Sequence, residues 1–80
     1  MLTTDEFRVL DHTLTGGTGR RYRNHYSAGP GHSAYEVCTA LVERGLMWVQ
    51  PPNEWLPDET FHATLNGIGA WNNHRAGGGA

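Results

Sequence analysis

The sequence lacks several features that mark whole classes of protein. Its 80 residues include one cysteine, so an internal disulfide is excluded and the cysteine content gives no argument for secretion. No apolar run approaches the roughly 18 residues of a membrane helix, and no charged-then-apolar leader opens the chain. We therefore expect one small cytoplasmic domain that does not enter a membrane and has a single core.

Lysine is also absent, and all six basic residues are arginines. They are unevenly placed: residues 13–35 carry Arg20, Arg21 and Arg23 and no acid, a local charge of +3. Residues 1–12 sum to −2 and residues 36–80 to −3, which gives the net charge of −2. The chain is therefore predicted to be a basic loop set in an acidic body.

The residues that could carry chemistry form no recognisable catalytic or metal-binding pattern. The five histidines and Cys38 have neither C-x-x-C nor H-x-x-x-H spacing, and Cys38 falls on a predicted buried stripe. The GGTGR run at residues 16–20 lacks the Lys-Ser/Thr of a phosphate loop. We expect no enzyme activity, no metal and no cofactor.

A first helix is predicted over Leu2–Leu14. Thr3 and Glu6 have the spacing of a capping box, and Leu2 with Phe7 matches a hydrophobic staple. Phe7, Leu10 and Leu14 make one apolar stripe, and Gly16 and Gly17 end the helix.

A second helix is predicted over Ala34–Arg44, with a capping box from Ser33 and Glu36 and a Schellman-type stop at Gly45. Residues 46–50 and 60–64 are expected to be antiparallel strands, joined by a proline-containing loop of about nine residues. Thr64 is expected to cap a last helix that carries Leu65, Ile68 and Trp71.

Glycines, Pro30 and the lack of apolar periodicity argue against a helix over residues 15–32. Within this stretch we expect a short strand or an ordered loop over Arg21–Tyr26, with Tyr22 and Tyr26 packed on the domain. The fold class is therefore α+β, with three helices, a basic loop and a β-hairpin. It is expected to be one domain over residues 1–75, followed by a disordered glycine-rich tail over 76–80.

The second half of the chain resembles winged-helix domains, in which a recognition helix ends at a glycine, a hairpin wing follows and the return strand ends T-x-x-G. The matching residues are Leu41, Val42, Gly45, Leu46, Met47, Phe61, Thr64 and Gly67. The resemblance implies a winged-helix-like domain with an incomplete helix-turn-helix.

The stretch YRNHYSAGPGHSAYEVCTALVERGLM, residues 22–47, is also similar to short phage and prophage accessory proteins. Some small phage proteins with winged-helix-like folds are anti-CRISPR inhibitors. This resemblance implies a non-enzymatic monomer that binds a host CRISPR-Cas surveillance complex in the bacterial cytoplasm and blocks target DNA binding.

Two groups of residues are candidate contact sites. The first is an acidic docking face with an aromatic anchor, because buried tryptophan is a frequent interface hot spot; its members are Glu54, Trp55, Asp58, Glu59, Glu36 and Glu43. Trp55 could instead fold back on Trp48 or Trp71 to extend the core.

The second group is the basic loop, Arg20, Arg21, Arg23 and His25, which suits phosphates or an acidic partner. These arginines could instead pair with Glu36 or Glu43. If they bind nucleic acid, the protein would be a small winged-helix transcriptional regulator. The two acids on the second helix disfavour reading of DNA bases by that helix.

Overall fold

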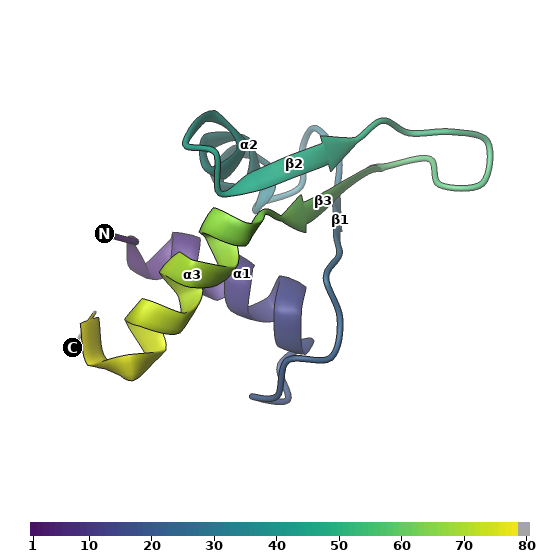
Figure 1. The fold of residues 1–80 in the computed structure, drawn as a ribbon. Coiled ribbons are helices and arrows are strands. Elements are labelled where there is room, and N and C mark those ends of the chain that lie inside the picture. Colours follow the sequence, from purple (N-terminus) through teal and green to yellow (C-terminus); the bar gives the residue numbers. More distant parts are fainter. Residues whose placement is uncertain (79–80) are drawn as a thin grey trace.

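The computed structural model describes residues 1–78 and confirms the predicted α+β class (Figure 1). Three helices pack against one face of a three-stranded antiparallel sheet. In chain order the elements are α1 (Thr4–Thr15), β1 (Tyr26–Ala28), α2 (Tyr35–Glu43), β2 (Met47–Gln50), β3 (Glu59–Ala63), α3 (Leu65–Asn73) and a closing helical turn (His74–Gly78).

The sheet has the order β1-β3-β2, with β3 antiparallel to both neighbours. The predicted hairpin is β2–β3, in which Trp48 faces His62 across the ladder. The third strand, β1, begins at Tyr26, where the predicted strand or ordered loop ends, and pairs Tyr26 with Phe61. Its pairing makes β3 the central strand, an arrangement that the sequence did not predict.

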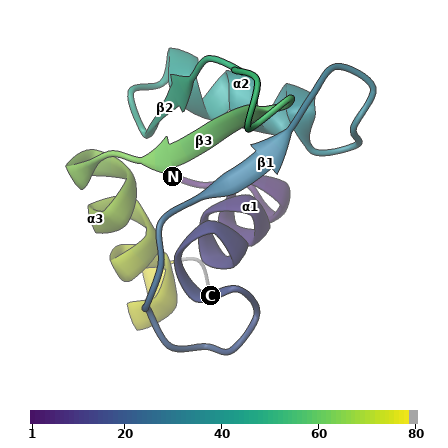
Figure 2. The same ribbon diagram turned by 90° about the vertical axis from the view of Figure 1, so that its right-hand side faces the viewer.

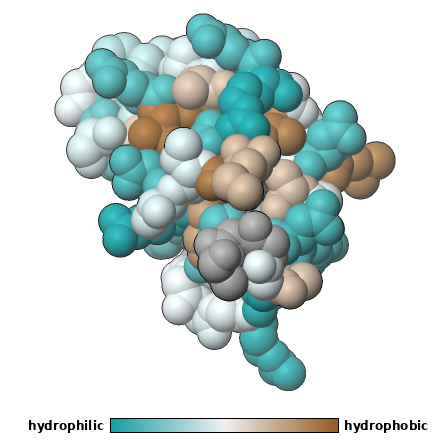
Figure 3. All heavy atoms as spheres, turned by 90° about the vertical axis from the view of Figure 1, so that its left-hand side faces the viewer, coloured by the Kyte–Doolittle hydropathy of each residue, from teal (hydrophilic) through white to brown (hydrophobic). Residues whose placement is uncertain are grey.

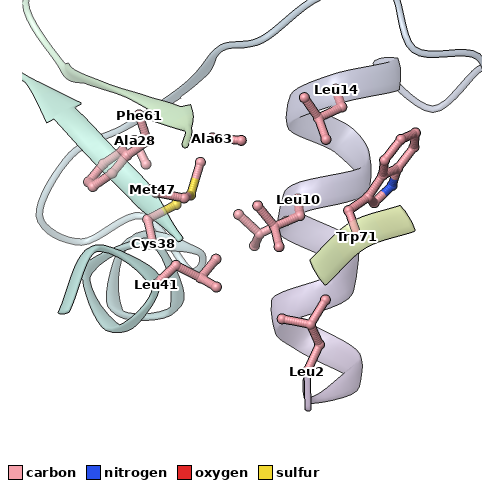
Figure 4. Packing of buried hydrophobic residues seen from close by; sticks show 11 residues of the cluster. Leu2, Leu10, Leu14, Ala28, Cys38, Leu41, Met47, Phe61, Ala63 and Trp71 are labelled. Carbon is pink, nitrogen blue, oxygen red and sulfur yellow. The ribbon is translucent and has the colours of Figure 1, made fainter. Parts of the chain in front are cut away.

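The core lies between α1, α2, α3 and one face of the sheet (Figures 2 and 4). Leu10 and Leu14 of α1 point toward the sheet, where Met47, Phe61 and Ala63 meet them. Cys38 and Leu41 close the core from α2, and Trp71 closes it from α3. Alternation along the strands therefore sends Trp48 and His62 to the opposite face of the sheet.

The start of α1 follows the sequence prediction. The Thr3 hydroxyl accepts the Glu6 amide and the Glu6 carboxylate accepts the Thr3 amide, so the capping box is complete. Phe7, which was predicted on the buried stripe, is only half-buried, and its ring stacks on His74 with centroids 4.2 Å apart.

The start of α2 differs from the prediction. Ala34 is the N-cap residue and no side chain caps this helix, so the Ser33–Glu36 capping box is wrong. Tight turns over residues 29–35 lead into the helix, and within them Nδ1 of His32 accepts the Ala34 amide at 3.0 Å. The predicted stop is confirmed: Gly45 has φ of +74°, and the amides of Gly45 and Leu46 donate to Val42 and Leu41.

Thr64 caps α3 as predicted, and its hydroxyl accepts the Gly67 amide at 3.0 Å. The same hydroxyl donates to the Gly45 carbonyl oxygen, which joins the start of α3 to the end of α2. Gly67 allows this approach, because a Cβ there would overlap the Leu46 carbonyl oxygen. The first turn of α3 places Gly67 against Leu46, and Leu65 faces solvent.

Of the predicted tail, residues 76–78 belong to the closing turn, and residues 79–80 lie outside the described residues. Across residues 1–78, none of the helices is long and apolar enough to cross a membrane.

Candidate functional site

The loop of residues 51–58 extends from the end of the β2–β3 hairpin, away from the helices (Figure 1). We call it the hairpin loop. Every residue in it is exposed, and the Trp55 side chain is 82% exposed. The alternative in which Trp55 folds back onto Trp48 or Trp71 is therefore wrong. Leu56 beside it is also exposed, so the tip presents two adjacent apolar side chains to solvent.

Hydrogen bonds within the hairpin loop fix its tip. The Asn53 side-chain oxygen accepts the amides of Trp55 and Leu56 at 2.8 and 2.9 Å, and the Asn53 amide donates to the Leu56 carbonyl oxygen. Pro51, Pro52 and Pro57 restrict the backbone on either side. A tip held in this way loses less conformational entropy when Trp55 enters a partner's pocket.

The acidic residues proposed for the docking face do not form one cluster. Glu54 and Asp58 are exposed on the hairpin loop. Glu59 begins β3 and accepts a hydrogen bond of 2.6 Å from the Tyr35 hydroxyl, which raises the pKa of Tyr35. Glu36 instead lines a shallow hollow with Thr3, Asp5 and Glu6 at the start of α1, so it is not part of the surface around the hairpin loop. Glu43 lies at the other end of α2, about 10 Å further along the helix axis.

We call residues 20–25 the basic segment; it runs from the bottom of the view up to β1, apart from the hairpin loop at the upper right (Figure 1). Arg23 is tied back to the end of α1: its side chain donates to the carbonyl oxygens of Thr13 and His25. Arg20 and Arg21 are exposed. Among residues 1–78, ion pairs form only between Arg8 and Asp5 and between Arg44 and Glu6, so the alternative pairing of the loop arginines with Glu36 or Glu43 is wrong.

Backbone hydrogen bonds also hold the basic segment. The amides of Tyr22 and Arg23 both donate to Leu14, and the His25 amide donates to Thr13. Tyr22 was expected to pack on the domain, but its side chain is 66% exposed. Partial burial and then the charge of Arg23 lower the pKa of His25 from its ordinary 6.5, which favours the neutral form of its ring.

Sequence reasoning missed the outer face of the sheet. Trp48 is 50% exposed and stacks on His62, with ring centroids 4.2 Å apart and planes within 23°. Nδ1 of His62 donates to the Asn24 carbonyl oxygen at 2.7 Å. The period-2 pattern of the strands could have placed both rings outside the core, but their link to the basic segment depends on the position of β3.

Asn24 makes that link through its side chain. Its amide nitrogen donates to the Ala63 carbonyl oxygen at 3.0 Å, and its amide oxygen accepts the Ala63 amide at 2.7 Å. These bonds continue the β1–β3 ladder by one further pair, so the basic segment is attached to the end of the sheet.

Cys38 is buried, and burial raises the pKa of its thiol to about 11. A thiol in this state is a poor nucleophile at neutral pH. Within residues 1–78, three or more His, Cys, Asp or Glu side chains are nowhere gathered as a metal site would require.

A hollow of about 310 Å³ opens between the N-terminus, the end of α2 and α3. Met1, Leu2, Leu46 and Ala70 line its apolar part, and His74 stands at its edge. Figure 3 views the side of the molecule on which both chain ends lie, where hydrophobic residues form small groups between hydrophilic ones. This hollow is separate from both candidate contact sites.

Comparison with known proteins finds no match to this chain among family models, curated proteins or solved structures.

Proposed function

We propose that the protein is a non-enzymatic binding protein that docks on a partner protein through its hairpin loop. The observation that carries this proposal is Trp55, a large aromatic side chain exposed on a loop whose backbone is fixed by Asn53. Leaving it in water is unfavourable unless a partner covers it, and tryptophan is enriched among interface hot spots.

The charges around Trp55 specify the kind of partner. Glu54 and Asp58 flank it, and Glu59 begins β3 at the base of the loop. An acidic rim around an apolar anchor complements a basic surface with an apolar pocket, such as a channel that holds nucleic acid.

The resemblance to phage accessory proteins supports a narrower proposal: the partner is the DNA-binding channel of a host CRISPR-Cas surveillance complex, and the protein is an anti-CRISPR inhibitor. The fold is proposed to be a winged-helix variant in which the basic segment and β1 take the place of one helix. The stop at Gly45, the hairpin and the Thr64–Gly67 turn support that assignment.

The test is binding to purified surveillance complexes by biolayer interferometry, together with a gel shift that reports their capture of target DNA. Trp55→Ala is expected to weaken binding by about 30-fold, the loss of a hot spot worth about 2 kcal/mol. A Glu54→Arg, Asp58→Arg double variant should slow association. Glu59 is left unchanged there because its hydrogen bond to Tyr35 supports the fold.

Leu65→Ala and Asp5→Arg are the matched controls, since both alter exposed side chains away from the hairpin loop. Unchanged affinity in the Trp55 and double variants would refute docking through the hairpin loop. Failure to bind any surveillance complex would refute the anti-CRISPR assignment alone.

A further inference from the structure

Four of the six arginines gather where the basic segment meets the turn after α3, a region that we call the basic end. Arg75 follows α3 in the sequence, but its guanidinium lies over the Trp71 ring at 4.4 Å and donates to the Gly19 carbonyl oxygen at 3.0 Å. It thereby joins Arg20, Arg21 and Arg23. Asp11 lies nearby and accepts a hydrogen bond from the Trp71 ring nitrogen. The group therefore contains four arginines and one acid, and its net charge is positive.

This basic end continues onto the outer face of the sheet. Tyr22 and Arg23 precede Asn24, whose carbonyl oxygen accepts a hydrogen bond from His62. The Trp48 ring stacks on His62, so a continuous path of contacts joins Tyr22 to Trp48. A depression of about 390 Å³ lies along its start, lined by Arg21, Tyr22, Arg23 and Asn24. Tyr22 and Trp48 are exposed aromatic residues at the two ends of this path, and Arg20 and Arg21 directly precede Tyr22 in the chain.

Fixed backbone geometry distinguishes this surface from a solvated charged loop. Leu14 and Thr13 hold the backbone of residues 22–25, and the Asn24 side chain attaches it to Ala63. Among residues 1–78, the side chains of Arg20 and Arg21 take part in none of these bonds, so their guanidinium groups are available to a ligand.

We infer that this surface binds single-stranded nucleic acid, with Arg20 and Arg21 on the phosphates and Tyr22 and Trp48 as stacking platforms for bases. Arginine pairs with phosphate oxygens through its planar fork. Bases stack on aromatic rings regardless of sequence, and only unpaired bases expose their faces. The inference is independent of the proposed function, because the hairpin loop contributes no residue to this surface.

The proposed contacts between arginines and phosphates predict that the affinity for single-stranded nucleic acid falls as salt rises. If Arg20 and Arg21 each neutralise one phosphate, the slope of log affinity against log salt is about −1.4, at roughly 0.7 for each phosphate of a single strand. Affinity then falls about sevenfold between 50 and 200 mM salt. The Arg20→Ala, Arg21→Ala double variant retains neither contact, and its affinity should change by less than about twofold over the same range.

The experiment is fluorescence anisotropy of a labelled 15-nucleotide oligo-dT with the full chain at 50 mM salt and above. The double arginine variant should bind more weakly and with the smaller slope, whereas Arg8→Ala, an exposed arginine on α1, should bind as the wild type does. Trp48→Ala should weaken binding at least about fivefold, as expected for the loss of about 1 kcal/mol of stacking. Thermal melting of each variant checks that it is folded.

A second readout does not require removal of Trp48. In the Trp55→Phe variant, the remaining tryptophans are Trp48 and the buried Trp71, so quenching by oligo-dT reports stacking on Trp48. The inference is overturned if oligo-dT does not bind at 50 mM salt, or if the double arginine variant or Trp48→Ala binds as tightly as the wild type. It is also overturned if a poly-glutamate peptide binds more tightly than oligo-dT, because the ligand would then be an acidic polypeptide.

Discussion

The ion pair between Glu6 and Arg44 should control how stability depends on pH. The Glu6 side chain is 9% exposed, and both of its oxygens lie 2.6 Å from Nη1 of Arg44, which joins the first turn of α1 to the end of α2. Burial alone would raise the pKa of Glu6, but hydrogen bonds from Arg44 and Thr3 outweigh it and lower the pKa below its ordinary 4.5.

The substitution Glu6→Gln isolates the charge. Glutamine also serves in a capping box, so the bond to the Thr3 amide is retained while the ion pair is lost. A hydrogen bond to a charged group contributes about 1.5–3 kcal/mol, and the Arg44 side chain is 41% exposed, which weakens the pair by solvent screening. We expect a loss of about 1–2 kcal/mol and a fall in Tm of about 5–15 °C at pH 7.

The sign of the pH effect follows from the lowered pKa. The carboxylate stabilises the folded state at pH values above the unfolded pKa of 4.5, and this contribution is lost as the pH falls through the folded pKa. Melting curves from pH 7 to pH 2.5 should therefore show wild type and Glu6→Gln converging in acid. Asp5→Asn, at an exposed 3.9 Å pair with Arg8, should change stability by less than about 0.5 kcal/mol. An equal Tm for wild type and Glu6→Gln at pH 7, or a constant difference at every pH, would refute this account.

Two further predictions concern the core and the approach of α3. Gly67→Ala should destabilise the fold by about 2 kcal/mol or more in urea unfolding, because its Cβ would overlap the Leu46 carbonyl oxygen. Gly69→Ala has open space in the same helix and should stabilise by about 0.5–1 kcal/mol; equal effects of the two substitutions would contradict the role of Gly67. The Cys38 thiol, with its pKa raised to about 11 by burial, should react with a thiol reagent at pH 8 only after denaturation. Rapid reaction of the native protein would show that Cys38 is reached from solvent.

Local sequence signals predicted the features whose partners are near in the chain. The Thr3–Glu6 capping box, the Gly45 stop and the Thr64 cap each join residues within a few positions of one another, so their spacing alone was informative. The predicted Ser33 cap is wrong because the successive turns over residues 29–35 make Ala34 the N-cap residue of α2, and a spacing rule does not include such turns.

Contacts between distant segments decided what the candidate sites look like. Trp55 was identified from the sequence as a possible anchor, but its exposure depends on where the hairpin projects. The outer face of Trp48 and His62 was missed because its connection to Asn24 spans 38 residues. Arg75 joins the basic end through Gly19, which is 56 residues away.

By itself, the sequence determined the helices and hairpin, the uneven charge and the single small core, because periodicity, capping and turn residues act over short distances. Only the tertiary structure decided that β1 pairs with β3, that Gly67 must be small, that Arg75 bonds to Gly19 and that His62 bonds to Asn24. Those features arise from packing between segments far apart in the chain, and no local pattern of residues specifies which of those segments will meet.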